Sequence, residues 1–183
     1  MRRPWTLSTK LGAIGGTLLL VALVSIGLTL WVTWQLEGGA AAVNEAGRMR
    51  MQTWRLAQTL AAGDAARIEV LLEQFDQSVA VLRSGDPSRP LFVPRDQRSQ
   101  ESFAVVQHDW ATLRSGWSAA ARPAAAEVAR QAEAFVERID AFVSAIELQL
   151  AQLTAILNAF QFVLVALAII SAVTLLYSAY LFV

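Results

Sequence analysis

The sequence predicts an all-α protein in which a membrane-anchored, antiparallel four-helix bundle lies between two transmembrane helices. Long uncharged apolar runs lie near both ends, all 15 acidic residues lie between them, and the middle segment has apolar residues at three- and four-residue steps. The 183 residues are 55% hydrophobic with a mean hydropathy of +0.44, which is more apolar than an ordinary soluble domain. We therefore expect a membrane protein with one helical domain.

The first apolar run covers Leu11 to Trp34 without a charge and would span about 36 Å as a helix, enough to cross a bilayer. A secretory signal peptide is the alternative interpretation, but this run exceeds the usual ~7–15 apolar residues and ends in tryptophans rather than at a small-residue cleavage site. Arg2, Arg3 and Lys10 precede it, which places residues 1–10 in the cytoplasm and residues 11–34 in the first transmembrane helix.

The second apolar run has no charged residue from Leu148 to Val183, and we assign residues 159–183 to the second transmembrane helix. Residues 35–158 then form the bundle, whose segment between the spans carries 15 acidic residues against 12 arginines and no lysine. This balance predicts a multi-pass protein of the bacterial inner membrane with the bundle in the periplasm. The aromatic residues expected at the two membrane interfaces are Trp31 and Trp34 outside, and Tyr177, Tyr180 and Phe182 inside.

The bundle should contain four helices. Gly38 and Gly39 either loosen the first helix or are carried through it, and this helix should continue over 41–62 and end at Gly63. Asp64 should cap a second helix over 65–82, a loop rich in glycine and proline follows over 84–94, and a third helix is expected over 99–119. Pro123 fits the first turn of a fourth helix. That helix has the strongest periodicity, with apolar residues at 128, 132, 135, 139, 142, 146, 150, 153 and 157 running into the second span.

Composition argues against several functions. Without cysteine the chain has no disulfide framework or thiolate metal site, and its zero net charge argues against nucleic-acid binding. His108, the single histidine, has no second ligand for a metal and is expected to lie at the surface or fill the bundle. No paired carboxylates or nucleophile–base arrangement is evident, so we expect no catalysis, no cofactor and no metal.

Arg50 is the candidate functional residue. On a helix the residues within about 60° of it are all uncharged, whereas Arg48 and Arg55 lie about 160° and 140° away. These uncharged neighbours are Val43, Ala46, Gly47, Thr53, Trp54 and Ala57. A buried guanidinium on such a face is costly unless an anion meets it. The pattern therefore predicts either a bound anion or an ion pair with an acidic residue of the fourth helix, such as Glu133 or Asp140.

The segment around Arg50 resembles the periplasmic box of nitrate/nitrite sensor histidine kinases of the NarX and NarQ type. The matching residues are Asn44, Ala46, Gly47, Arg50, Met51, Gln52, Arg55 and Leu56. It is also similar to the sensor segment of type IV pilus methyl-accepting chemotaxis transducers. The resemblance implies that Arg50 contacts nitrate or nitrite and that both protomers of a homodimer contribute this arginine.

The chemistry around Arg50 fits a small planar oxyanion. If the first helices of two protomers pack about a two-fold axis, Ala46 and Gly47 permit close approach and the two Arg50 side chains repel unless an anion lies between them. Gly47 has two interpretations: it leaves room for a ligand or a partner backbone to come close, or it is a tolerated helix glycine. We expect Met49, Met51 and Trp54 to pack, with Trp54 also a candidate wall of the site, and Glu45 to bridge to Arg48. Asn44 lies about 120° from Arg50, so no direct contact is expected.

The sequence is compatible with three functions. The main hypothesis is a sensory input module that binds nitrate or nitrite and signals through its membrane helices to a two-component histidine kinase. In it the cognate response regulator is reached only through an output domain, which we expect in a longer protein. The alternative keeps the fold as the ligand-sensing region of a methyl-accepting chemotaxis transducer. The third is a structural or partner-binding membrane protein in which Arg50 makes only an internal ion pair.

Overall fold

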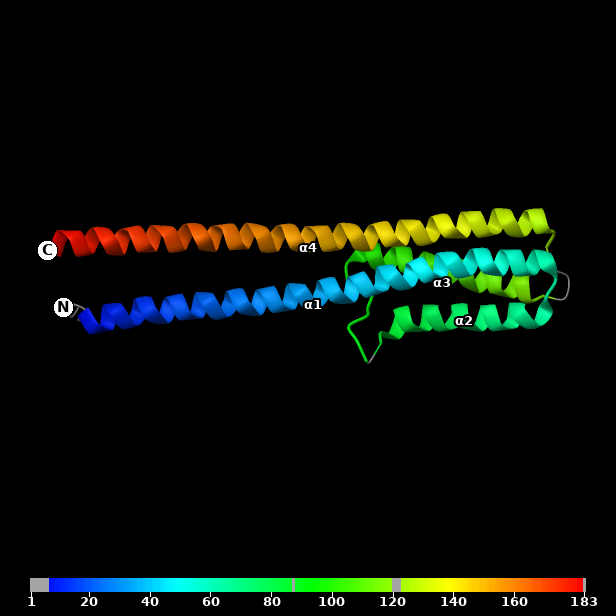
Figure 1. Ribbon diagram of the computed structural model, residues 1–183, viewed down its shortest axis with the longest axis horizontal. Coiled ribbons are helices and arrows are strands. Elements are labelled where there is room, and N and C mark those ends of the chain that lie inside the picture. The colour runs from blue at the N-terminus through cyan, green and yellow to red at the C-terminus, as the bar shows by residue number, and fades with distance from the viewer. Residues whose placement is uncertain (1–6, 87, 120–122, 183) are drawn as a thin grey trace. The chain divides into compact units, whose positions relative to one another are not determined.

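The computed structural model describes residues 7–86, 88–119 and 123–182, and the described residues form four helices and no strand (Figure 1). The helices are α1 (Leu7–Ala62), α2 (Ala65–Ser84), α3 (Gln97–Ser118) and α4 (Ala125–Phe182). The predicted all-α class is therefore confirmed, and the helices that carry the two apolar runs are by far the longest.

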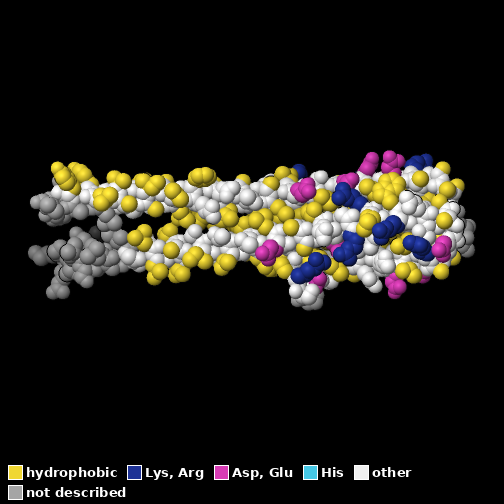
Figure 2. All heavy atoms as spheres, viewed as in Figure 1, with side chains coloured by type: hydrophobic (Ala, Val, Ile, Leu, Met, Phe, Trp, Pro, Cys, Tyr) yellow, Lys and Arg dark blue, Asp and Glu magenta, His cyan; other side chains and the backbone are white. Residues whose placement is uncertain are grey.

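The chain divides into two compact units. Trp34–Gln152 form one unit, and the remaining parts of α1 and α4 form the other. In the second unit the large apolar side chains are mostly exposed, including Leu19, Leu20, Phe162 and Leu176 (Figure 2). Such exposure is unfavourable in water, and both helices are long and apolar enough to cross a membrane. These properties fit a membrane protein with a helical bundle between two spans.

The structure describes only some of the residues from which the membrane orientation was predicted. Tyr177 and Tyr180, expected at the inner interface, are exposed on α4, and Trp31 is exposed on α1. Arg2 and Arg3, and the side chains of Lys10 and Phe182, lie outside the described residues. The assignment of residues 1–10 to the cytoplasm therefore stays a prediction.

One hydrophobic core holds the bundle of Trp34–Gln152 together, and α4 supplies its most regular seam. Its members, spaced three and four residues apart, are at most 2% exposed: Val128, Ala132, Phe135, Ile139, Phe142 and Ile146. Beyond Ile146 the seam is only partly buried at Leu150 and Leu153. The 3–4 periodicity thus predicted the buried face of α4 within the bundle.

Aromatic and polar contacts set how α2, α3 and α4 face one another. The rings of Phe75 and Trp110 stack at 3.9 Å, and Phe135 lies 5.7 Å from Phe75 between ring centroids. Asp76 accepts hydrogen bonds from Trp110 Nε1 at 2.8 Å and Arg114 Nε at 2.7 Å, and this carboxylate raises the pKa of Arg114. The α2–α3 pair is therefore joined by a ring stack and a charged hydrogen bond at adjacent positions.

The helix ends follow the expected chemistry except in one place. Gly63 takes a positive φ of 77°, and the Asp64 side chain accepts a hydrogen bond from the Arg67 backbone N–H at 3.1 Å. Gly38 and Gly39 do not break α1, which runs through them. Pro123 was predicted in the first turn of the fourth helix. In the structure α4 begins at Ala125, so Pro123 lies two residues before it.

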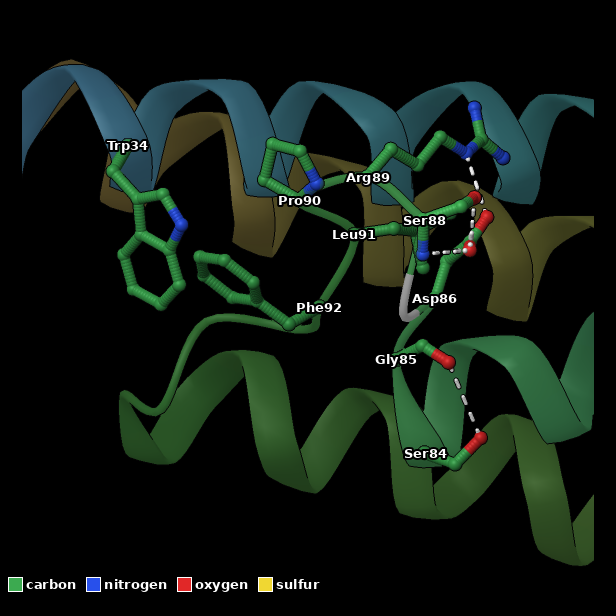
Figure 3. Close-up of a pocket in the computed structure, with 9 residues that line it drawn as sticks. All are labelled: Trp34, Ser84, Gly85, Asp86, Ser88, Arg89, Pro90, Leu91 and Phe92. Carbon is green, nitrogen blue, oxygen red and sulfur yellow. Dashed lines mark hydrogen bonds and ion pairs between the residues drawn. The ribbon is translucent and has the colours of Figure 1, made fainter.

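The two glycines have a packing role in the bundle. A Cβ atom on Gly38 would overlap the Phe92 ring, and the Phe92 backbone N–H donates to the Gly38 carbonyl at 3.5 Å. A Cβ atom on Gly39 would lie 2.6 Å from Leu150 Cδ2 of α4. Phe92 also packs on Trp34, with ring centroids 4.5 Å apart (Figure 3). The α2–α3 loop and α4 thus both fit against α1 where it lacks side chains.

We predict that Gly38→Ala lowers the thermal unfolding midpoint of the full chain in detergent, followed by circular dichroism, because the new methyl group meets the Phe92 ring. In a Phe92→Ala background the same change should instead stabilise the chain, since alanine favours a helix over glycine by about 1 kcal/mol.

The control is Gly116→Ala in α3, where a Cβ atom would meet nothing within 4 Å and the change should stabilise in both backgrounds. An equal loss of stability from Gly38→Ala with and without Phe92 would show that the ring does not occupy the space over Gly38.

Candidate ligand-binding site

The segment 43–56 lies within the bundle part of α1, and the core decides which of its side chains reach the surface. Residues at most 7% exposed are Glu45, Ala46, Met49, Gln52, Thr53 and Leu56. The exposed ones are Asn44, Arg48, Arg50, Met51, Trp54 and Arg55. The predicted arginine therefore lies on the outer side of α1 rather than in a buried seam of its own chain.

Arg50 forms an ion pair across to α4. Its Nη1 donates to Asp140 Oδ1 at 2.7 Å, and the two side chains are 44% and 50% exposed. Asp140 is one of the two acidic partners that the sequence offered for an internal ion pair. The helical wheel of α1 suggested that no acidic group lies near Arg50, and this was wrong. The wheel contains no information about α4, which supplies Asp140.

Gly47 lies under the Arg50 side chain. A Cβ atom at Gly47 would be 3.7 Å from Arg50 Nη2, an ordinary van der Waals separation, and it would touch no other group within 4 Å. Alanine would thus fit this position within a single chain. Neither the fold nor the Arg50–Asp140 pair requires glycine here, which fits both a tolerated helix glycine and the close approach of a ligand or partner.

The other predicted site residues separate into two groups. Met51 and Trp54 are 47% and 42% exposed, so the expectation that they pack within the bundle is wrong, while Met49 is fully buried as expected. Ala46 is 0% exposed, so its side chain lies in the core and cannot reach a ligand at Arg50 or a partner helix. Arg50, Gly47, Met51 and Trp54 share the accessible side of α1, and Asn44 is exposed.

The polar members of the motif have local structural partners. Gln52 is buried, and its Oε1 accepts a hydrogen bond from Ser78 of α2 at 3.3 Å. Glu45 and Arg48 form the predicted ion pair at 3.3 Å. Arg55 faces the seam between α1 and α2 and not the Arg50 surface. Gln52 therefore joins helices instead of forming part of the Arg50 surface.

The α2–α3 loop contains a charged turn that the sequence reasoning passed over. Asp86 accepts hydrogen bonds from the Ser88 backbone N–H at 2.9 Å, from the Ser88 hydroxyl at 2.6 Å and from Arg89 Nε at 2.9 Å (Figure 3). These donors, chiefly those of Ser88, lower the pKa of Asp86 to about 2. An aspartate followed two residues later by serine was the available signal. With Trp34 and Phe92 the turn borders a hollow of about 590 Å³.

The sequence matches a model of a known protein family over most of the bundle. The PilJ model, described as the N-terminal region of type IV pili methyl-accepting chemotaxis transducers, matches residues 31–142. The chain belongs to this family. Comparison with curated proteins gives no match. Of the two resemblances carried by Asn44–Leu56, the family match supports the PilJ type; the nitrate-sensor resemblance stays a prediction.

The matched segment is of a sensor type. It includes the part of α1 with Arg50 and Gly47, all of α2 and α3, and α4 as far as Phe142. Among the described residues no group of three or more His, Asp or Glu side chains is arranged to hold a metal ion. The Arg50 surface presents a guanidinium that already donates to a carboxylate, that of Asp140.

We predict that the Arg50–Asp140 pair contributes little to folding. Because both side chains are about half exposed, a double-mutant cycle with Arg50→Gln and Asp140→Asn should give a coupling energy of about 0.2–1 kcal/mol. Urea unfolding of the full chain in detergent measures it. A coupling above about 2 kcal/mol would mean that the pair is essential to the bundle.

We also predict a pKa of about 2 for the Asp86 carboxyl by carbon NMR, rising towards its ordinary value of 3.8 in Ser88→Ala. Because the folded-state pKa is lowered, the stabilisation from Asp86 is complete above about 3.8 and is lost as the pH falls through about 2. An unchanged Asp86 pKa in Ser88→Ala would contradict this assignment of the donors.

Proposed function

We propose that the chain is the ligand-sensing N-terminal region of a methyl-accepting chemotaxis transducer, held in the inner membrane with residues 35–158 in the periplasm. The family match and the helical bundle between two apolar helices support this role. α1 is a single helix from an apolar segment into the bundle, and α4 is a single helix from the bundle into the other apolar segment. A change in the bundle can therefore pass along unbroken helices.

We propose nitrate or nitrite as the ligand and Arg50 as the residue that binds it, shared between the α1 helices of a homodimer. The observation that carries this proposal is the exposure of Arg50 beside a glycine that its own chain does not need. A partner α1 approaching over Gly47 would also cover Met51 and Trp54, which are otherwise exposed apolar surface. A planar oxyanion between two guanidiniums would remove their repulsion.

Asp140 gives this site a way to signal. Its carboxylate accepts a hydrogen bond from the Arg50 guanidinium at 2.7 Å and joins α1 to α4. An oxyanion that takes the same donors competes with Asp140 and loosens that tie. Binding would then favour an arrangement in which α1 and α4 are less strongly connected, which is the differential affinity that any ligand-driven change requires.

A histidine kinase output is the second candidate. It rests on the likeness of Asn44–Leu56 to nitrate/nitrite sensor kinases, whereas the match over residues 31–142 favours a chemotaxis transducer. Both outputs use the same input chemistry at Arg50. The ligand can therefore be tested independently of the output.

The test is calorimetric titration of the full chain in lipid nanodiscs with nitrate, nitrite, sulfate and chloride. We expect saturable binding of nitrate or nitrite at about one ion per two chains, abolished by Arg50→Gln. Asp140→Asn should tighten binding by a factor of about 1.4 to 5, because it removes a competing carboxylate worth about 0.2–1 kcal/mol.

Arg98→Gln serves as the control, since Arg98 is exposed on α3 and takes no part in the Arg50–Asp140 ion pair. Binding of none of these anions by a folded dimer would refute the oxyanion proposal and leave Arg50–Asp140 as a structural ion pair. Weaker binding in Asp140→Asn would refute the competition while keeping the site.

A further inference from the structure

A basic groove runs along the seam between α1 and α2, on a different side of α1 from Arg50, and Met51 lies at the border of the two surfaces. It consists of two hollows of about 480 Å³ and 580 Å³ that share Arg55 of α1 and Gln74 of α2. Arg55 lies about 140° around α1 from Arg50, so the two arginines serve different surfaces. Figure 2 shows arginine side chains gathered over the part of the molecule formed by α1 and α2.

The charges in the two hollows differ. In the first, Arg48 is paired with Glu45 at 3.3 Å and Arg89 with Asp86 at 2.9 Å. In the second, Arg55 and Arg67 have no ion-pair partner within the part of the chain that the structure describes, and no acidic residue lines it. The second hollow thus presents two permanent positive charges from two helices.

The remaining lining suits a small organic molecule better than a bare ion. Gln58 and Gln74 place amide groups beside the arginines, and Leu71, which is 8% exposed, adds an apolar contact. Guanidiniums, amides and an apolar floor in one hollow match a short carbon chain with acidic ends.

We propose that this α1–α2 groove binds a small organic anion with two carboxylates, one held by Arg55 and the other by Arg67. A guanidinium can donate two parallel hydrogen bonds to one carboxylate, so each arginine is a complete partner for one end of such a ligand. A monocarboxylate satisfies only one of the two charges. The bound ligand joins α1 to α2 at the end of the groove near the Gly63–Asp64 turn.

This proposal goes beyond the oxyanion function and does not depend on it. The Arg50 site needs a second chain and a small planar anion, whereas the groove lies within one chain and takes a larger anion with two acidic groups. A variant at Arg67 should leave nitrate binding intact, so failure of either proposal is recognisable separately.

The test is calorimetric titration of the full chain in lipid nanodiscs at low, matched ionic strength. The probes are succinate, propionate as the ligand with one carboxylate removed, and inorganic phosphate. We expect saturable succinate binding at one ion per chain, and affinity weakened about tenfold or more for propionate and in Arg55→Gln and Arg67→Gln. Arg98→Gln removes the same charge from α3 and should leave the succinate affinity unchanged.

Thermal unfolding checks that the variants are folded, which is expected because both arginines are exposed. Equal affinity for succinate and propionate, or binding of phosphate without succinate, would overturn the dicarboxylate assignment. Succinate binding that Arg55→Gln and Arg67→Gln leave unchanged would place the ligand elsewhere. No succinate binding by the folded chain would show that the two arginines are simply hydrated.

Discussion

The burial of the α4 seam is the constraint on which the bundle depends. Val128, Phe135, Ile139, Phe142 and Ile146 are at most 2% exposed, and the aromatic rings of α2 and α3 close around them. α1 must then turn its own apolar series, with Ala42, Ala46, Met49 and Leu56, towards the same core. This orientation directs the residues on the opposite face of α1, Arg50 among them, outwards. Arg50 reaches the surface for this reason and not because of any local preference of its own.

A half-exposed ion pair is well suited to a residue that must exchange partners. In a dry interior the Arg50 guanidinium and the Asp140 carboxylate would be costly to separate, whereas about half exposure keeps their attraction small. An external anion can compete with an intramolecular one only when the latter is weakly held. The structural ion pair and the proposed sensory role are therefore compatible states of one arginine.

The fold was predictable from the sequence because its signals are long and regular. The apolar runs, the α4 periodicity and the Gly63–Asp64 junction each depend on local patterns, and the structure follows them. What could not be predicted were relations between helices. The Asp140 pairing was only one of two options, the burial of Ala46 was missed, and so was the exposure of Met51 and Trp54. A helical wheel places residues around one axis but does not say which side neighbouring helices cover.

The fit of Leu150 against Gly39 has a consequence for how α4 can move. The side chain occupies space that any larger residue on α1 would fill, since a Cβ atom there would lie 2.6 Å from Leu150 Cδ2. Sliding α4 along α1 would have to lift Leu150 out of this notch and over neighbouring side chains before another resting position is reached. Helix pairs packed in this way shift between discrete packing arrangements and do not slide continuously. Side-chain packing therefore favours a few discrete axial positions of α4 relative to α1 within the bundle. Small fluctuations at a binding site do not by themselves move α4 from one position to the next.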